Sequence, residues 1–191
     1  MTLSRPSKAL APLLAGLLVF SAGVFAQADT SEPTIELQTC ELLVPGTPLS
    51  TVGECGWLEV AENPSEPEGR KIKVRVARVP ARGRVAEPDP LVFFAGGPGQ
   101  SATESWPIVA GALSKLNETR DILLGDQRGT GQSNALKCPQ VELDEALALD
   151  WDELASSTQE CLDSLDGDPR FYTTTIAMHD IDAAREALGY E

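Results

Sequence analysis

Two glycine-rich segments, each directly after a short apolar run, hold the residues of this sequence whose types and spacing could do chemistry. The first is Gly96–Ser101, after the run Leu91–Phe94, and the second is Gly125–Ser133, after the run Asp121–Leu124. Because glycine has no Cβ, such turns can bend sharply and bring their N–H groups close to a ligand oxygen. In acyl-transfer enzymes these donors stabilise the oxyanion of the tetrahedral intermediate. Taken alone, the first segment fits a plain tight turn equally well.

Other kinds of active site find little support in the sequence. There is no CxxC pair and His179 is the only histidine, so we expect no metal. Gly125–Ser133 is not a P-loop, because no Lys-Ser/Thr follows its glycines, and it lacks the third glycine of a dinucleotide-binding turn. We therefore expect no cofactor. The nucleophile motif Gly-x-Ser-x-Gly does not occur in the sequence.

The elements that must position the two segments follow an α/β order. Gly56–Ala61 and Lys71–Val79 are predicted strands, and in the second of them apolar and basic residues alternate. Leu91–Phe94 is a continuous apolar run, which is typical of a strand buried on both faces of a parallel sheet, and Asp121–Leu124 is predicted as a second strand of this type. The predicted helices are Ser105–Leu116, Val141–Leu165 and Thr174–Leu188.

The last of these helices has the clearest pattern. Its apolar residues recur at spacings of four, three and four, on one face: Ala177, Ile181, Ala184 and Leu188. Thr174 or Thr175 can cap its start, and Gly189 is placed to end it. His179 lies among polar neighbours and is expected on the exposed surface.

The N-terminal residues have the pattern of a secretory signal peptide. Arg5 and Lys8 are followed by the apolar run Ala9–Ala26, and Ala26-Gln27-Ala28 fits a small-x-small cleavage site. The alternative is an uncleaved membrane anchor, but the run is short for a spanning helix, and a proline and two glycines interrupt it. We expect residues 1–28 to be removed, and the mature chain to be secreted or periplasmic without stable membrane insertion.

The charge limits the expected partners, and export bears on the cysteines. The chain has a formal net charge of −14, and without residues 1–28 it holds 13 Lys+Arg against 29 Asp+Glu, a net charge of −16. Such a surface repels nucleic acid, which is therefore not an expected partner. Export makes disulfides the first interpretation of the four cysteines. Of the three ways to pair them, we predict the local one, which closes short loops: Cys40 with Cys55, and Cys138 with Cys161.

The two glycine segments together resemble the proline iminopeptidase family of α/β-hydrolases, and especially its secreted tripeptidyl-aminopeptidase-like branch. AGGPGQS is similar to the family's HGGPG, and GDQRGTGQS to its D-Q-R-G-x-G-x-S loop. Phe171–Thr175, Asp180–Asp182 and Arg185–Gly189 resemble the family's helix before the nucleophile elbow. The resemblance covers roughly residues 53–190. Ala95 stands where many members have a histidine; that histidine is not a triad member, so acyl chemistry is not excluded.

The resemblance implies roles for the first segment. The backbone N–H of Gly97 would be one oxyanion donor, with Gly96, Pro98 and Gly99 as its support. The tight turn implies a cis peptide bond before Pro98.

The resemblance also implies that Asp126, Gln127 and Arg128 form a buttress. Arg128 can make a forked pair with a carboxylate, and Asp126 is the nearest candidate in sequence. The alternative is a surface loop with an ordinary ion pair. Glu104 and Trp106 follow the first segment and are candidates to line the substrate mouth, with a surface loop as an equal alternative.

As a whole, the implied fold is α/β: the N-terminal portion of an α/β-hydrolase, with a mostly parallel sheet, truncated before the nucleophile elbow. The expected organisation is a signal peptide at 1–28, an N-terminal lead-in at 29–52 and a partial α/β-hydrolase domain at 53–191.

Intact relatives cleave peptides by Ser-His-Asp chemistry, so a peptide is the implied substrate. This chain has no nucleophile motif and no catalytic histidine, and it is expected to be inactive alone. Without the next strand, Leu91–Phe94 becomes an exposed edge through which copies can self-associate. The alternative function is a secreted, disulfide-stapled binding module without catalysis.

Overall fold

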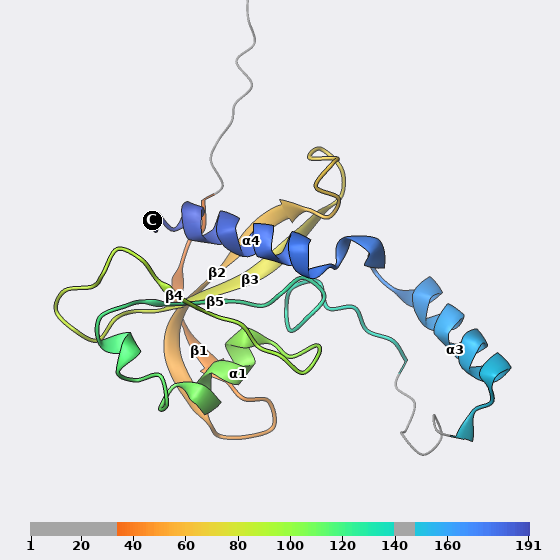
Figure 1. The fold of residues 1–191 in the computed structure, drawn as a ribbon, viewed down its shortest axis with the longest axis horizontal. Coiled ribbons are helices and arrows are strands. Elements are labelled where there is room, and N and C mark those ends of the chain that lie inside the picture. Colours follow the sequence, from red (N-terminus) through yellow and green to blue (C-terminus); the bar gives the residue numbers. More distant parts are fainter. Residues whose placement is uncertain (1–33, 140–147) are drawn as a thin grey trace, which may run out of the picture. The chain divides into compact units, whose positions relative to one another are not determined.

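The computed structural model describes residues 34–139 and 148–191 (Figure 1). The predicted signal peptide lies outside the described residues. The elements, in chain order, are β1 (Gln38–Leu43), β2 (Ser50–Ala61), β3 (Lys71–Val79), β4 (Leu91–Phe93), α1 (Ala102–Val109), β5 (Ile122–Gly125), α3 (Trp151–Ser164) and α4 (Thr174–Ala187). Strands and helices are both present in an α/β order, as the sequence predicts.

The strands form one mixed sheet in the order β1-β2-β3-β5-β4. The pairs β1–β2, β2–β3 and β3–β5 are antiparallel, and only β4–β5 is parallel. The expectation of a mostly parallel sheet is therefore wrong for the described residues. Short loops join β1, β2 and β3 and force antiparallel pairing, whereas β4 reaches β5 through a crossover that contains α1. The arrangement is compatible with part of an α/β-hydrolase fold.

The strands differ in how well the sequence predicted them. The bounds of β3 are as predicted, with Lys71 and Lys73 exposed and Ile72 and Val74 buried. β2 begins at Ser50 rather than Gly56, and β1 was not predicted at all. Only one of the six side chains of β1 is buried, so the strand has no apolar alternation to detect. Its pairing with β2 holds it in place.

Two apolar clusters lie on opposite faces of the sheet because neighbouring strand residues point to opposite sides. One cluster is covered by α1 and contains Leu42, Cys55, Ala77, Ala102, Trp106, Ile122 and Leu124. The other is covered by α4 and contains Leu58, Val74, Val76, Leu123 and Ala184. Figure 1 shows the two helices on either side of the sheet.

The helices begin and end at residues that differ from several predictions. α1 starts after Ser101 and ends at Val109, earlier than the predicted Ser105–Leu116, because the Ser101 side chain caps it. α4 is capped by Thr173, whose hydroxyl accepts from the Ile176 N–H, rather than by Thr174 or Thr175. Gly189 has a φ of +76°, which suits a residue ending a helix, as predicted. The predicted helix Val141–Leu165 is α3 in its described part.

Both predicted disulfides are confirmed. Cys40–Cys55 crosses the β1–β2 pair, and Cys138–Cys161 ties the segment after β5 to α3. Within residues 34–139 and 148–191, every helix is too short or too polar to cross a bilayer.

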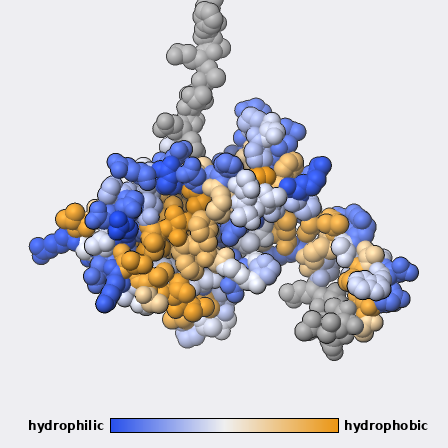
Figure 2. All heavy atoms as spheres, viewed as in Figure 1, coloured by the Kyte–Doolittle hydropathy of each residue, from blue (hydrophilic) through white to orange (hydrophobic). Residues whose placement is uncertain are grey.

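β4 lies at the edge of the sheet, and its three residues are only half-buried, not buried on both faces as predicted. Beside it, Phe94 is 42% exposed, and Ile108 of α1 is 64% exposed. Figure 2 shows a hydrophobic patch over this part of the molecule. An apolar edge strand without charge or proline lacks the usual protection against pairing with another chain.

We therefore predict that the chain self-associates through β4 when its disulfides are formed. The net charge opposes association, but salt screens it beyond about 8 Å, whereas strand pairing acts at contact. Sedimentation at tens of micromolar is the measurement, and Phe94→Lys should shift the protein toward monomer. A wild-type chain that stays monomeric would contradict the prediction.

Candidate active site

The fold brings the two glycine-rich segments together. β4 and β5 are parallel, with Leu91 beside Ile122, so their carboxyl ends open at the same edge of the sheet. The segment after β4 and the segment after β5 begin there. They line a cavity of about 440 Å³, to which the first segment contributes residues 95–100 and the second contributes Gln127 and Thr130.

Gly97 has a backbone conformation that favours glycine. Its φ is +132°, a region that side chains rarely adopt, and a Cβ there would stand 3.0 Å from the Gln100 Cγ. The Gly97–Pro98 peptide bond is cis, as the resemblance implied. Among residues 34–139 and 148–191, no hydrogen bond uses the Gly97 N–H. This donor, on an exposed residue that lines the cavity, is therefore free to meet a ligand oxygen.

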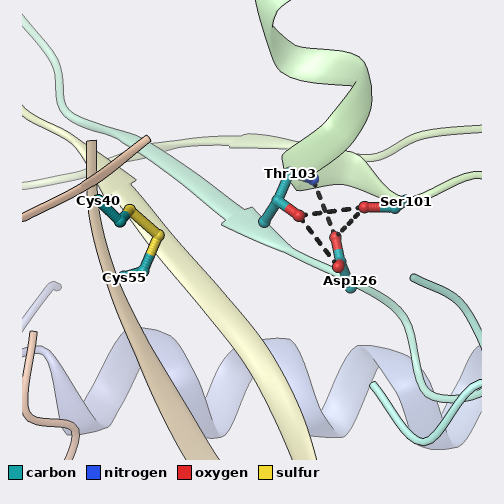
Figure 3. The surroundings of a disulfide bond; sticks show 5 residues. All are labelled: Cys40, Cys55, Ser101, Thr103 and Asp126. Carbon is teal, nitrogen blue, oxygen red and sulfur yellow. Dashed lines mark hydrogen bonds between the residues drawn. A yellow bond between two sulfur atoms is a disulfide. The ribbon is translucent and has the colours of Figure 1, made fainter. Parts of the chain in front are cut away.

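The predicted pair between Asp126 and Arg128 is wrong. The Asp126 carboxylate instead binds the end of the first segment. The carboxylate is fully buried and accepts hydrogen bonds from Ser101 Oγ at 2.8 Å, Thr103 N at 2.9 Å and Thr103 Oγ1 at 3.0 Å. The Gln132 N–H adds a longer bond of 3.3 Å. Figure 3 shows the Ser101 and Thr103 groups converging on the carboxylate beside the Cys40–Cys55 disulfide. Asp126 thus fixes the N-terminus of α1, where the first glycine segment ends.

The second segment is shaped by this carboxylate. A Cβ on Gly131 would stand 2.4 Å from Asp126 Oδ2 and 2.7 Å from Ser101 Cβ, and Gly131 also has a φ of +51°. The glycine is therefore needed for packing. Both ends of the segment are clipped to β3, because the Asp126 N–H donates to the Arg75 carbonyl and the Arg75 N–H donates to Ser133 Oγ.

Arg128 forms its forked pair with Asp180 on α4. Arg128 Nε donates to Asp180 Oδ2 at 2.6 Å and Nη2 donates to Oδ1 at 2.7 Å. The remaining donors reach the carbonyls of Ala61, Glu62 and Phe171, so all five guanidinium N–H groups are used. The pair is buried and is not the surface ion pair that was the alternative.

A signal for Asp180 was present in the sequence. It falls between Ala177 and Ala184 on the apolar face of α4, where an acidic residue has no place unless it is paired. The pattern Ser101-Ala-Thr-Glu104 likewise marks the start of α1, since Ser/Thr followed three residues later by Glu is a capping signature.

The remaining candidates lie in different surroundings. Trp106 is 2% exposed and packs edge-on against Phe93 in the core, so it does not line a substrate mouth. Glu104 is half-buried and lines a second cavity; burial, followed by the charge of Asp126, raises the pKa of its carboxyl. His179 is exposed on α4, as predicted. In the described part of the chain, no cluster of three His, Cys, Asp or Glu residues could hold a metal ion.

Comparison with known proteins relates this chain to hydrolases. It is 31% identical over 132 residues to carboxylesterase B of Mycobacterium tuberculosis, in strains CDC 1551 / Oshkosh and H37Rv, and to a Mycobacterium bovis protein named only as a hydrolase. Each match covers 67% of this chain but 25% of the relative, so the chain spans about a quarter of the length of these proteins. No family model matches the sequence.

The Arg128–Asp180 pair predicts a large stability effect. Arg128→Lys keeps the charge but loses the fork, and Asp180→Asn leaves the guanidinium without its counter-ion. Breaking a buried pair costs about 3–5 kcal/mol, measurable as a lower free energy of unfolding in urea. The matched control is Arg185→Lys, because the Arg185–Asp182 pair has a 61% exposed carboxylate and should cost under about 1 kcal/mol. Equal effects at both sites would contradict this account.

The two tyrosines of the chain predict a pH effect. The Tyr172 hydroxyl donates to Glu62 Oε1 at 2.8 Å; burial, then this bond, raises the pKa of Tyr172 to about 12. Burial also raises the pKa of Tyr190. Since the unfolded chain ionises near pH 10, the neutral phenols stabilise the fold fully below that pH, and this stability is lost as pH rises from about 10 to 12.

Tyrosinate absorbance is the measurement. The native chain should ionise above the ordinary range, the urea-unfolded chain near pH 10, and Tyr172→Phe should leave one transition, from Tyr190. A native tyrosine that titrates near pH 10 would disprove the prediction.

Proposed function

We propose that this chain carries the oxyanion side of the active site of a secreted or periplasmic serine hydrolase that acts on peptides, of the proline iminopeptidase or tripeptidyl aminopeptidase type. The observation that carries the proposal is the cavity at the carboxyl ends of β4 and β5, which Gly97 lines and where its N–H donates no hydrogen bond to residues 34–139 or 148–191. Such a donor, held before the reaction, stabilises charge that develops in the transition state.

The peptidase type is favoured by the two sequence segments together. AGGPGQS and GDQRGTGQS occur in the order of that family, and in the structure the second segment supports the first through Asp126. The relatives named carboxylesterase B favour ester hydrolysis as a second candidate. Both reactions pass through the same tetrahedral oxyanion, so the oxyanion loop serves either. The two disulfides fit an oxidising compartment.

The chain spans about a quarter of its relatives, and its sequence holds no nucleophile elbow. The proposed activity therefore belongs to a longer protein or an assembly that includes this chain. There, the serine, its acid and its base would be placed against the cavity, and the N–H after the serine would be the second oxyanion donor.

We predict that the chain alone shows no turnover and that the complete protein hydrolyses peptides. Loss of a triad serine or histidine removes on the order of a million-fold of the rate, so the isolated chain should give blank rates with prolyl and tripeptidyl anilides and no labelling by fluorophosphonates. Fluorophosphonate labelling of any serine in the isolated chain would contradict the prediction.

Assays of the complete protein decide between the two candidates. Anilides with a free amino terminus, the same anilides acetylated, and short-chain acyl esters should be compared by kcat/KM. An aminopeptidase cleaves the free anilides and loses activity on the acetylated ones. Turnover of esters alone would replace the peptidase by a carboxylesterase, and no turnover at all, with no labelling, would leave the binding module.

A further inference from the structure

A second cavity, of about 340 Å³, lies between β1, β3 and the start of α1. It shares no lining residue with the cavity at Gly97. Its volume is at the lower end of the range of small-molecule sites, about 300–1,000 Å³. Arg75 of β3 and Glu104 of α1 line it, and Leu43 and Pro45 add apolar surface.

Arg75 contributes a half-buried cation. Its guanidinium lies 5.0 Å from the centre of the Trp57 ring. Hydrogen bonds to Asp126 and Ser133 fix the position of its backbone. In the part of the chain that the structure describes, the guanidinium takes part in no ion pair or hydrogen bond. Burial lowers the pKa of Arg75, and the negative charge of Asp126 opposes this shift.

Glu104 contributes a half-buried anion to the same cavity. Its carboxylate accepts no hydrogen bond within residues 34–139 and 148–191, whereas its backbone N–H donates to Ser101 Oγ. The two opposite charges do not pair with each other either. A partly buried charge without a partner costs free energy, so a ligand that carries both a cation and an anion would satisfy both residues at once.

We propose that this cavity binds a small zwitterion, a free amino acid with an aliphatic side chain. Its carboxylate meets the Arg75 guanidinium in a forked pair. Its ammonium group meets Glu104, with Glu41 as a further carboxylate at the rim. The side chain packs against Leu43 and Pro45. Binding needs no acyl chemistry, so the proposal does not depend on the proposed function.

The first test uses the unaltered chain and three probes of matched shape at constant ionic strength and neutral pH. They are L-leucine, 4-methylpentanoate, which lacks the amine, and 3-methylbutylamine, which lacks the carboxylate. Calorimetric titration should show leucine binding at least tenfold more tightly than either analogue. Equal affinities, or no leucine binding at millimolar concentration, would overturn the proposal.

The second test assigns the two charges. Arg75→Met should bind leucine as weakly as the wild type binds the amine, and Glu104→Gln as weakly as it binds 4-methylpentanoate. Arg84→Met and Glu68→Gln make the same charge changes at exposed positions and should leave binding unchanged. If both site variants bind leucine like the wild type, Arg75 serves only as a counter-charge to buried Asp126 and the proposal fails. If Arg75→Met does not fold, the three-probe comparison still decides.

Discussion

A carboxylate with no exposed surface, that of Asp126, joins the parts of this structure that bear on function. It accepts bonds from the cap residue Ser101, from both polar groups of Thr103 and from the second glycine segment. Each hydrogen bond to a charged group is worth about 1.5–3 kcal/mol, and together they offset the cost of burying the charge. The carboxylate also sits at the N-terminus of α1, where the helix dipole favours a negative group. Removing the carboxylate would leave Ser101, Thr103 and Gln132 without their common partner.

Arg128 likewise joins several segments through hydrogen bonds, and these segments lie further apart in the sequence. Its five donors hold the β2–β3 connection, the turn before α4 and Asp180 of α4 in one arrangement. A buried ion pair adds little net stability compared with apolar packing, so its main effect here is to fix geometry. The second glycine segment is thereby bound to α4 through Arg128 and to the first segment through Asp126. The proposed oxyanion role of Gly97 requires a donor that needs no rearrangement during the reaction, and the bonds of Asp126 to Ser101 and Thr103 fix the end of its segment.

Features formed by residues close together in the sequence were predicted correctly, and features formed by residues far apart in the sequence were not. β3, both disulfides, the end of α4 and the turn at Gly97 depend on local pattern or on glycine geometry, and the sequence was sufficient for them. β1 was missed because its side chains are mostly exposed and pairing with β2 defines it. The partner of Arg128 was misassigned because nearness along the chain was taken for nearness in space, while Asp180 lies 52 residues further along, on α4. Strand direction likewise depended on connections that apolar runs do not reveal.

The charged residues of the fold fall into two groups, those that the protein pairs internally and those that it leaves open to a ligand. Asp126 and Arg128 are buried, and every strong hydrogen-bonding direction they have is used by the protein. Arg75 and Glu104 are only half-buried, line one cavity and have no such partners among the described residues. A protein that satisfies its deepest charges so completely gains nothing in stability from leaving two others open. The same contrast separates the backbone donors, since the N–H groups of Asp126 and Thr103 are used internally. The N–H of Gly97, which lines the other cavity, donates no hydrogen bond to residues 34–139 or 148–191. Groups that the fold leaves unsatisfied are therefore the ones available to a ligand.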